Sequence, residues 1–159
     1  MKLSKIFTLT LVLIVSFITL INSAQALDYT KRDLFESDFS GQNLSGSTFN
    51  KTNLRSSNLS NANLQKASFF GANLDSANLE GADLRNAVLD SARLTKANLH
   101  NAILEGAFAT NTKFEKANID GADFTDVILR PDVEAILCEN ATGTNPVTGR
   151  NTRDTLYCE

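Results

Sequence analysis

The sequence has 159 residues, enough for one domain, and a formal net charge of −3 from 15 basic and 18 acidic residues. This acidic balance argues against a general nucleic-acid binder. One histidine, two cysteines and no tryptophan leave few side chains for metal binding or catalysis.

The first 26 residues have the composition of an export signal. Lys2 and Lys5 precede an apolar run over 6–21, and Ala24 and Ala26 form an A-x-A cleavage site. A membrane anchor is the alternative, but the run is short for a bilayer span of about 20 residues, and no basic stop-transfer segment follows. We therefore expect a cleaved signal peptide, whose removal leaves 13 basic and 18 acidic residues, a net charge near −5.

A period of five dominates residues 32–131. Leu, Phe or Ile occupies 19 of the 20 positions from 34 to 129 in steps of five, and Ala109 is the exception. In most units a small residue, often alanine, stands two positions earlier, and the residue between them is mostly Asn or Asp. A helix repeats its apolar face every 3.6 residues and a strand every 2, so neither explains the pattern. Twenty gapless units predict a repeat architecture.

The unit A-(D/N)-L-x-x resembles the pentapeptide-repeat family over about 100 residues. The resemblance implies an all-β fold, a right-handed quadrilateral β-helix in which four units form one square coil. It also implies that the central residue and the small residue point inward and that the other three point outward. Twenty units then give about five coils, spaced by about 4.8 Å, the ordinary distance between strands.

Stacking in steps of 20 predicts ladders of side chains in the interior. One ladder holds Leu34, Leu54, Leu74, Leu94 and Phe114, and another holds Phe49, Phe69, Leu89, Ala109 and Leu129. Asn, Asp, Ser and Gly outside the core supply the turns. We expect a filled interior with no pore and no ligand cavity. At Ala109 the sequence leaves two readings open, since either Phe108 enters through a bulge or the interior narrows.

Both ends of such a rod need covering, because a terminal coil leaves backbone groups unpaired. At the N-terminal end the candidates are Leu27, Tyr29 and Phe35. At the other end the pattern changes after Pro131 to a short predicted helix with Asp132 as its N-cap, followed by a turn-rich loop. The predicted organisation is a signal peptide 1–26, a β-helix 27–131 with its repeats in 32–131, and a capping segment 132–159.

Cys138 and Cys158 lie 20 residues apart in a chain expected to be exported, which suggests one disulfide. The bridge would close a loop of about 20 residues and stabilise the tail by about 3 kcal/mol. It is read as a structural staple, with a redox-regulated switch as the alternative. The segment TNPVTGRNTRDTLYC also resembles the C-terminal segment of exported cyanobacterial and thylakoid-lumenal pentapeptide-repeat proteins. This resemblance implies the thylakoid lumen or the periplasm.

The outward positions supply the candidate interaction surface. An apolar stripe is formed by Val88, Phe108 and Ile128, which stand one coil apart in one column. Such a stripe either lies under the chain's own C-terminal helix or contacts a partner.

Basic residues share a second face: Arg93, Lys96, Lys113 and Lys116. Acidic residues gather on a third: Asp83, Glu105, Asp123 and Asp126. These charges are read either as a solvated surface or as an oriented docking surface. Asn58, Asn78, Asn98 and Asn118 are expected to stack as an amide ladder.

No catalytic, cofactor-binding or metal site is predicted. His100 shares a column with Glu80 and Asp120, and a weak metal site there lacks a cleft. A second functional class is the DNA mimic, a protein that inhibits or protects an enzyme such as gyrase. Three features disfavour it: the chain is expected to be exported, the rod is short, and basic residues interrupt its acidic surface. The preferred reading is a non-enzymatic interaction module, expected to be monomeric, that binds an unknown protein and neither nucleic acid nor, after cleavage, membrane.

Overall fold

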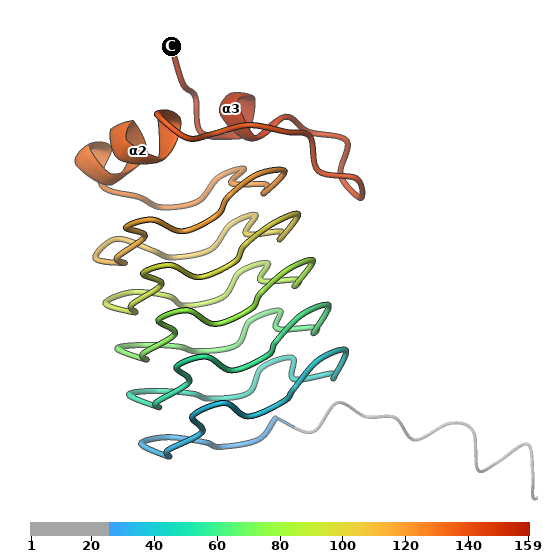
Figure 1. Ribbon diagram of the computed structural model, residues 1–159, viewed down its shortest axis with the longest axis vertical. Helices are drawn as coiled ribbons and strands as arrows, with labels where there is room; N and C mark the ends of the chain where they lie inside the picture. Colours follow the sequence, from blue (N-terminus) through green and yellow to red (C-terminus); the bar gives the residue numbers. More distant parts are fainter. Residues whose placement is uncertain (1–25) are drawn as a thin grey trace, which may run out of the picture.

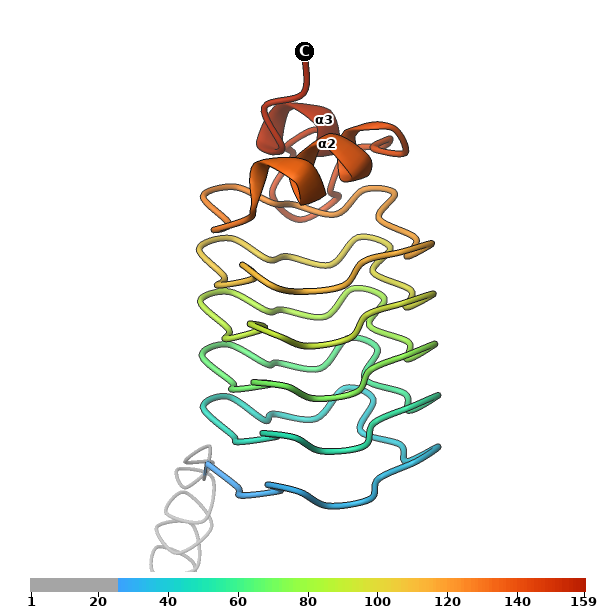
Figure 2. The same cartoon turned by 90° about the vertical axis from the view of Figure 1, so that its left-hand side faces the viewer.

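A computed structural model of the chain describes residues 26–159. Ala26 is its first described residue, whereas Ala24 and the rest of the predicted signal peptide lie outside the described residues. The described chain winds into stacked coils of similar size, with the C-terminal segment lying across one end (Figures 1 and 2).

Successive coils are joined in parallel, in a register of 20 residues. Bridges form four columns around the rod, which begin at the pairs Asp28–Thr48, Asp33–Asn53, Asp38–Asn58 and Asn43–Asn63. In each column the bridge recurs every 20 residues, up to Phe108–Ile128 in the first. Each bridge involves one residue per coil, so within residues 26–159 the predicted β-helix consists of single-residue bridges rather than extended strands.

Each pentapeptide turns a quarter of the way round because its polar residues fold back on the backbone. In the unit around Leu79, the Oδ1 atom of Asn78 accepts a hydrogen bond from the Glu80 N–H at 3.2 Å. The turn residue, two positions after the centre, is Gly81 with a φ of 64°. The next unit starts with the Ala82 N–H, which donates to the Leu79 carbonyl at 3.0 Å. Asn and Asp suit the position before the centre because their side chains mimic a backbone turn.

The interior follows the predicted ladders, and the large central residues are buried from Phe39 to Phe124. The repeat also begins one unit earlier than predicted, at LDYTK, because Tyr29 occupies a central position. Its ring stacks on that of Phe49 with centroids 4.8 Å apart, and Phe49 stacks on Phe69 at 4.9 Å. Of the three predicted N-terminal caps, Tyr29 therefore contributes to the core, while Leu27 and Phe35 remain exposed.

At the irregular unit, Ala109 faces the interior and Phe108 does not. Ala109 is fully buried, whereas Phe108 is 48% exposed and points away from the rod. The chain adapts at the following corner. Among the turn residues from 31 to 126, all of them described, Asn111 is the one without a positive φ. Its N–H donates to the Asp90 side chain at 3.1 Å.

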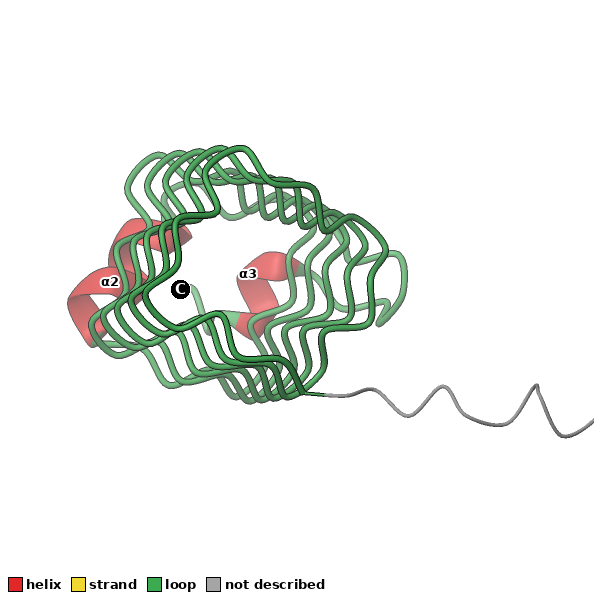
Figure 3. Cartoon of the chain, turned by 90° about the horizontal axis from the view of Figure 1, so that it is seen from below, coloured by secondary structure: helices red, strands yellow, loops and turns green. Residues whose placement is uncertain are grey.

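Two helices follow the last coil. Helix α2 spans Pro131–Cys138, with Arg130 as its N-cap residue and Pro131 at the first helical position. The predicted N-cap was therefore wrong by two residues, and Asp132 instead lies in the first turn, paired with Arg130 at 2.6 Å. Helix α3, Thr152–Thr155, was not predicted. In a view along the rod, α3 lies behind the interior and α2 behind one wall (Figure 3).

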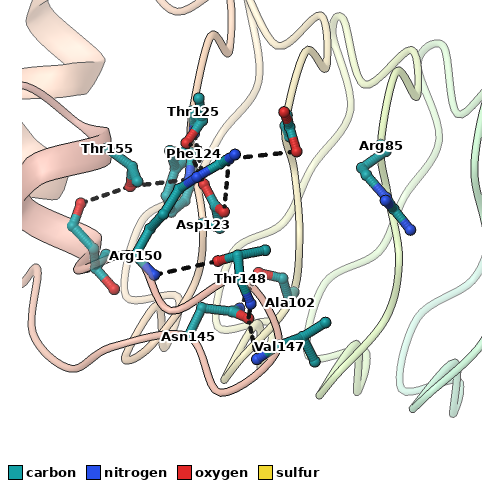
Figure 4. A network of polar contacts seen from close by, with 12 residues as sticks. Arg85, Ala102, Asp123, Phe124, Thr125, Asn145, Val147, Thr148, Arg150 and Thr155 are labelled. Atoms are coloured by element: carbon teal, nitrogen blue, oxygen red, sulfur yellow. Dashed lines mark hydrogen bonds and ion pairs between the residues drawn. The ribbon is translucent and has the colours of Figure 1, made fainter.

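We call residues 131–159 the cap, since they form hydrogen bonds with backbone groups of the last coil, such as that of Phe124 to Thr155 (Figure 4). The Gly121 N–H donates to the Thr142 carbonyl at 2.8 Å, and the Phe124 N–H donates to the Thr155 Oγ1 atom at 3.1 Å. The buried amide of Asn145 donates to the carbonyls of Gly121 at 2.9 Å and Ala102 at 3.3 Å. In a longer rod, the N–H groups of Gly121 and Phe124 would donate to the next coil, as those of Asn101 and Leu104 do.

Candidate functional site

The apolar stripe is exposed. Phe108 and Ile128 are 48% and 49% accessible, and Val88 below them is half-buried. They occupy the predicted single column, because Val88 bridges to Phe108 and Phe108 to Ile128. Helix α2 does not cover them, since they are exposed and the helix instead packs Leu137 and Val133 against the core. The expectation that the chain's own C-terminal helix lies on the stripe was therefore wrong.

The basic face consists of the outward residues of the units centred on Leu54, Leu74, Leu94 and Phe114. Arg93 bridges to Lys113 in one of its columns, as predicted, and Lys96 and Lys116 occupy the turn positions beside them. The structure adds Arg55 to this face. A shallow hollow of about 520 Å³ lies among these side chains and is bordered by Arg55, Arg93 and Lys96. The stripe and the basic face meet along one corner of the rod, because their units follow one another in the chain.

On the acidic face, arginines neutralise part of the predicted charge. Arg85 makes a two-pronged contact with Asp83, in which its Nε atom lies 2.9 Å from Oδ1. Burial would raise the pKa of Asp83, but hydrogen bonds from Arg85 and Gln65 outweigh it, so the pKa lies below its usual value. At the capped end, Arg150 lies 3.2 Å from Asp123 and 3.4 Å from Glu105. This face is thus partly occupied by the chain's own cations.

Asp123 is the one aspartate of that face that is completely buried. Its Oδ1 atom accepts hydrogen bonds from the Thr125 N–H at 2.9 Å and from the Thr125 hydroxyl at 2.6 Å, and Oδ2 faces Arg150 (Figure 4). Burial raises the pKa of this carboxyl. The pKa nevertheless lies below its usual value, because hydrogen bonds from Thr125 and Thr148 and the charge of Arg150 outweigh burial. Asp123 is therefore ionised and ties the cap to the rod.

His100 lies in the predicted column with Glu80 and Asp120, but its ring is already engaged. Nδ1 lies 2.9 Å from the Asp120 carbonyl oxygen, and Nε2 lies 3.0 Å from the side-chain nitrogen of Asn101. Glu80 accepts instead from Asn98, at 3.2 Å. In residues 26–159 no three His, Cys, Asp or Glu side chains are placed to hold a metal ion. These contacts make His100 part of the surface hydrogen-bond network.

The predicted amide ladder is present next to this histidine. The side-chain amide of each asparagine donates to the one a coil below, at 3.5 Å from Asn78 to Asn58, 3.1 Å from Asn98 to Asn78 and 3.0 Å from Asn118 to Asn98. Its role is structural, because the same side chains also hold the turns.

The cysteines are joined as predicted. Cys138, at the end of α2, and Cys158, after α3, form a disulfide with their Cα atoms 5.5 Å apart. Arg153 reinforces the junction by donating to the carbonyls of Cys138 and Glu159, each at 3.0 Å. The bridge thus ties the two helices of the cap together.

A sequence profile of the family described as Pentapeptide repeats matches residues 33–69, 67–106 and 92–130, more than half of the chain. The chain belongs to the pentapeptide-repeat family. The β-helix described above is therefore the right-handed β-helix of that family.

Two solved pentapeptide-repeat proteins are similar to this one. A protein from the thylakoid lumen of Arabidopsis thaliana is 50% identical, with 82% of this chain and 90% of that chain covered and a TM-score of 0.81. A protein from Nostoc PCC 7120 is 27% identical, with 73% of this chain and 95% of that chain covered and a TM-score of 0.56.

A curated relative has a name that refers to the same compartment. The chloroplastic thylakoid lumenal 15 kDa protein 1 of Arabidopsis thaliana is 58% identical over 36 residues. The match covers 23% of this pentapeptide-repeat chain and spans only 16% of the relative's length. Within residues 26–159, neither helix has the length and apolar character that crossing a lipid bilayer requires.

Proposed function

We propose that this pentapeptide-repeat protein is a non-enzymatic interaction module of the thylakoid lumen that binds another protein on the outside of its rod. The observation that carries the proposal is the exposed pair Phe108 and Ile128, stacked on neighbouring coils. Adjacent large apolar side chains on a rigid surface favour contact with a partner over contact with water. The neighbouring basic face supplies charges that orient such a partner.

Two further observations favour binding over catalysis. The large side chains of the interior are buried against one another, so substrate would have to bind on the outer surface. The two hollows beside Arg93 and Asn118 are shallow and mostly polar, unlike the concave apolar sites of most enzymes. The lumenal location is supported by the compartment named for the solved and curated relatives and by the export-type residues 1–26.

The test is crosslinking from the stripe in the native compartment. A photoreactive amino acid replaces Phe108, and a matched control carries it in place of Ser60, an outward residue on a different face. Mass spectrometry of intact thylakoids is expected to recover a discrete partner from position 108 and not from position 60. Equal recovery from both positions, or none from either, would contradict the proposal.

A further inference from the structure

The outward charges of the rod are unevenly distributed. The four basic-face units, residues 52–56, 72–76, 92–96 and 112–116, carry five basic and two acidic residues, although the whole chain is net negative. The basic residues are Arg55, Arg93, Lys96, Lys113 and Lys116, and the acidic ones are Asp75 and Glu115. The units that follow on the next face, 57–61, 77–81, 97–101 and 117–121, contain no Lys or Arg. The cations are thus gathered on one side.

These cations have few partners of their own. Arg93 alone among the five forms an ion pair within the described part of the chain, to Asp75 at 2.7 Å. That pair is half exposed on the arginine side, so it holds Arg93 weakly. Arg55 lies over the ring of Phe35 at 5.7 Å, an arrangement that leaves the edge of its guanidinium group available. A carboxylate in the hollow would therefore meet three available cations, Arg55, Arg93 and Lys96.

Asp75 gives the hollow a hydrogen-bond acceptor beside its cations. Its Oδ2 atom faces Arg93, but its Oδ1 atom is buried and accepts no hydrogen bond from the described residues. A buried carboxylate oxygen without a donor is unfavourable, and a small rotation about the broad χ2 torsion would offer it to an incoming N–H group. A simple anion brings no such donor and is repelled by Asp75, whereas a peptide brings backbone N–H groups together with acidic side chains.

The dimensions fit an extended peptide. Arg55 and Lys96 belong to coils two turns apart, which places them about 10 Å apart along the rod, a distance that three residues of an extended chain span. Ser56 and Ser76, which stand at the turn positions of this face, offer hydroxyl groups along the same path.

We infer that the hollow among Arg55, Asp75, Arg93 and Lys96 binds an extended acidic segment of a partner protein. The three cations pair with carboxylates of the segment, and Asp75 accepts one of its backbone N–H groups. This inference rests on the proposed function, because it states which chemistry the partner presents beside the apolar stripe.

Peptide binding to the chain from residue 27 onward tests it directly. A fluorescent decapeptide of alternating Glu and Ser is titrated and followed by anisotropy, with a Gln-Ser decapeptide as the matched ligand. The Glu peptide is expected to bind and the Gln peptide to bind about tenfold more weakly, with the difference shrinking as salt rises. Equal binding of both peptides, or a difference that salt leaves unchanged, would overturn the inference.

Variants locate the site. The triple variant Arg55→Gln, Arg93→Gln and Lys96→Gln is expected to weaken binding of the Glu peptide about tenfold. The control, Lys31→Gln, Lys51→Gln and Lys66→Gln, removes the same charge from other faces and is expected to change binding less than about twofold. Thermal melts of both variants verify that they are folded. If the control loses as much binding as the triple variant, the interaction is a general charge effect and the hollow is not the site.

Two other anionic surfaces serve as competitors. Duplex DNA and vesicles of phosphatidylglycerol are added to the bound Glu peptide, and neither is expected to displace it at equal charge concentration. Displacement by DNA or by vesicles would show that the basic face binds nucleic acid or lipid, and would overturn the acidic-peptide inference.

In thylakoids, a crosslinker at Thr95 separates the two proposals. A partner recovered from Phe108 but not from Thr95 contradicts this inference alone, while recovery from neither position contradicts both.

Discussion

The side-chain amide of Asn145 donates to the backbone carbonyl of Gly121 at 2.9 Å, although 24 residues separate the two in the chain. The same nitrogen also faces the carbonyls of Asn101 and Ala102. One buried side chain of the cap thus joins the turns of the last two coils, at carbonyls of Asn101 and Gly121 that receive no hydrogen bond from the regular stacking of coils.

Replacing Asn145 with alanine should lower the free energy of unfolding by about 1–3 kcal/mol, because the buried carbonyl of Gly121 loses its donor. Urea denaturation measures the change. Asn140→Ala, an exposed asparagine of the same segment, serves as the control and should change stability by less than about 0.5 kcal/mol. Equal losses in the two variants would show that the contacts of Asn145 do not stabilise the last coils.

The buried carboxylate of Asp123 should make the cap sensitive to acid. Its pKa is depressed in the folded protein, so its contribution to stability is present above the unfolded value of about 3.9 and is lost as pH falls through the folded value. Melting temperatures measured from pH 7 down to pH 2 should fall more steeply below about pH 4 for the wild type than for Asp123→Asn. At pH 7 the variant should be the less stable of the two. Parallel curves would exclude Asp123 as the source of the acid sensitivity.

Breaking the disulfide should loosen the cap before the rod. In the Cys138→Ser, Cys158→Ser double variant, the closed loop of about 20 residues is released, which should lower stability by about 3 kcal/mol. Hydrogen exchange should speed up at the amides of Gly121 and Phe124, which donate to the cap. The amide of Leu84, in the middle of the rod, serves as the internal control and should keep its protection longer. Uniform acceleration at all three amides would argue against separate loosening of the cap.

A charge in the interior should unfold the rod altogether. Leu84 is completely buried in a middle coil, and Leu84→Asp would place an unpaired carboxylate among apolar side chains. Circular dichroism should show loss of the native fold at 25 °C. Asn86→Asp, two residues away on the outside, introduces the same group at an exposed turn position and should leave the fold intact. A folded Leu84→Asp variant would mean that the interior admits water.

The interior was predicted well because one rule repeats there. The period of five marked the central residues such as Leu84, and the resemblance to the pentapeptide-repeat family implied their inward direction and four units per coil, from which the 20-residue register and the stacked ladders follow. The disulfide was equally easy to predict, because two cysteines allow only one pairing. The first unit was missed because its central residue, Tyr29, is not one of the Leu, Phe or Ile residues that mark the other centres, and it was read as a cap.

The cap was harder to predict because its contacts follow no period. Asn145 reaches carbonyls 24 to 44 residues earlier in the chain, and Arg150 reaches Asp123 and Glu105. Such pairings depend on how the tail folds across the rod, and no local sequence pattern predicts them. The position of α2 was wrong for the same reason, since its apolar residues fit either the end of the rod or the stripe. The four-residue α3 is too short to leave a periodic signal.

The 20-residue register also dictates which changes of length the protein tolerates in evolution. Insertion of 20 residues of repeat would lengthen the rod by about 4.8 Å and leave every column aligned. Insertion of a single pentapeptide between Arg93 and Phe108 would satisfy the interior just as well, yet it would rotate everything beyond it by a quarter turn. Phe108 and Ile128 would then stand above another column, no longer in line with Val88. Selection for a continuous surface should therefore favour insertions and deletions of whole coils, while selection for folding alone would accept any multiple of five.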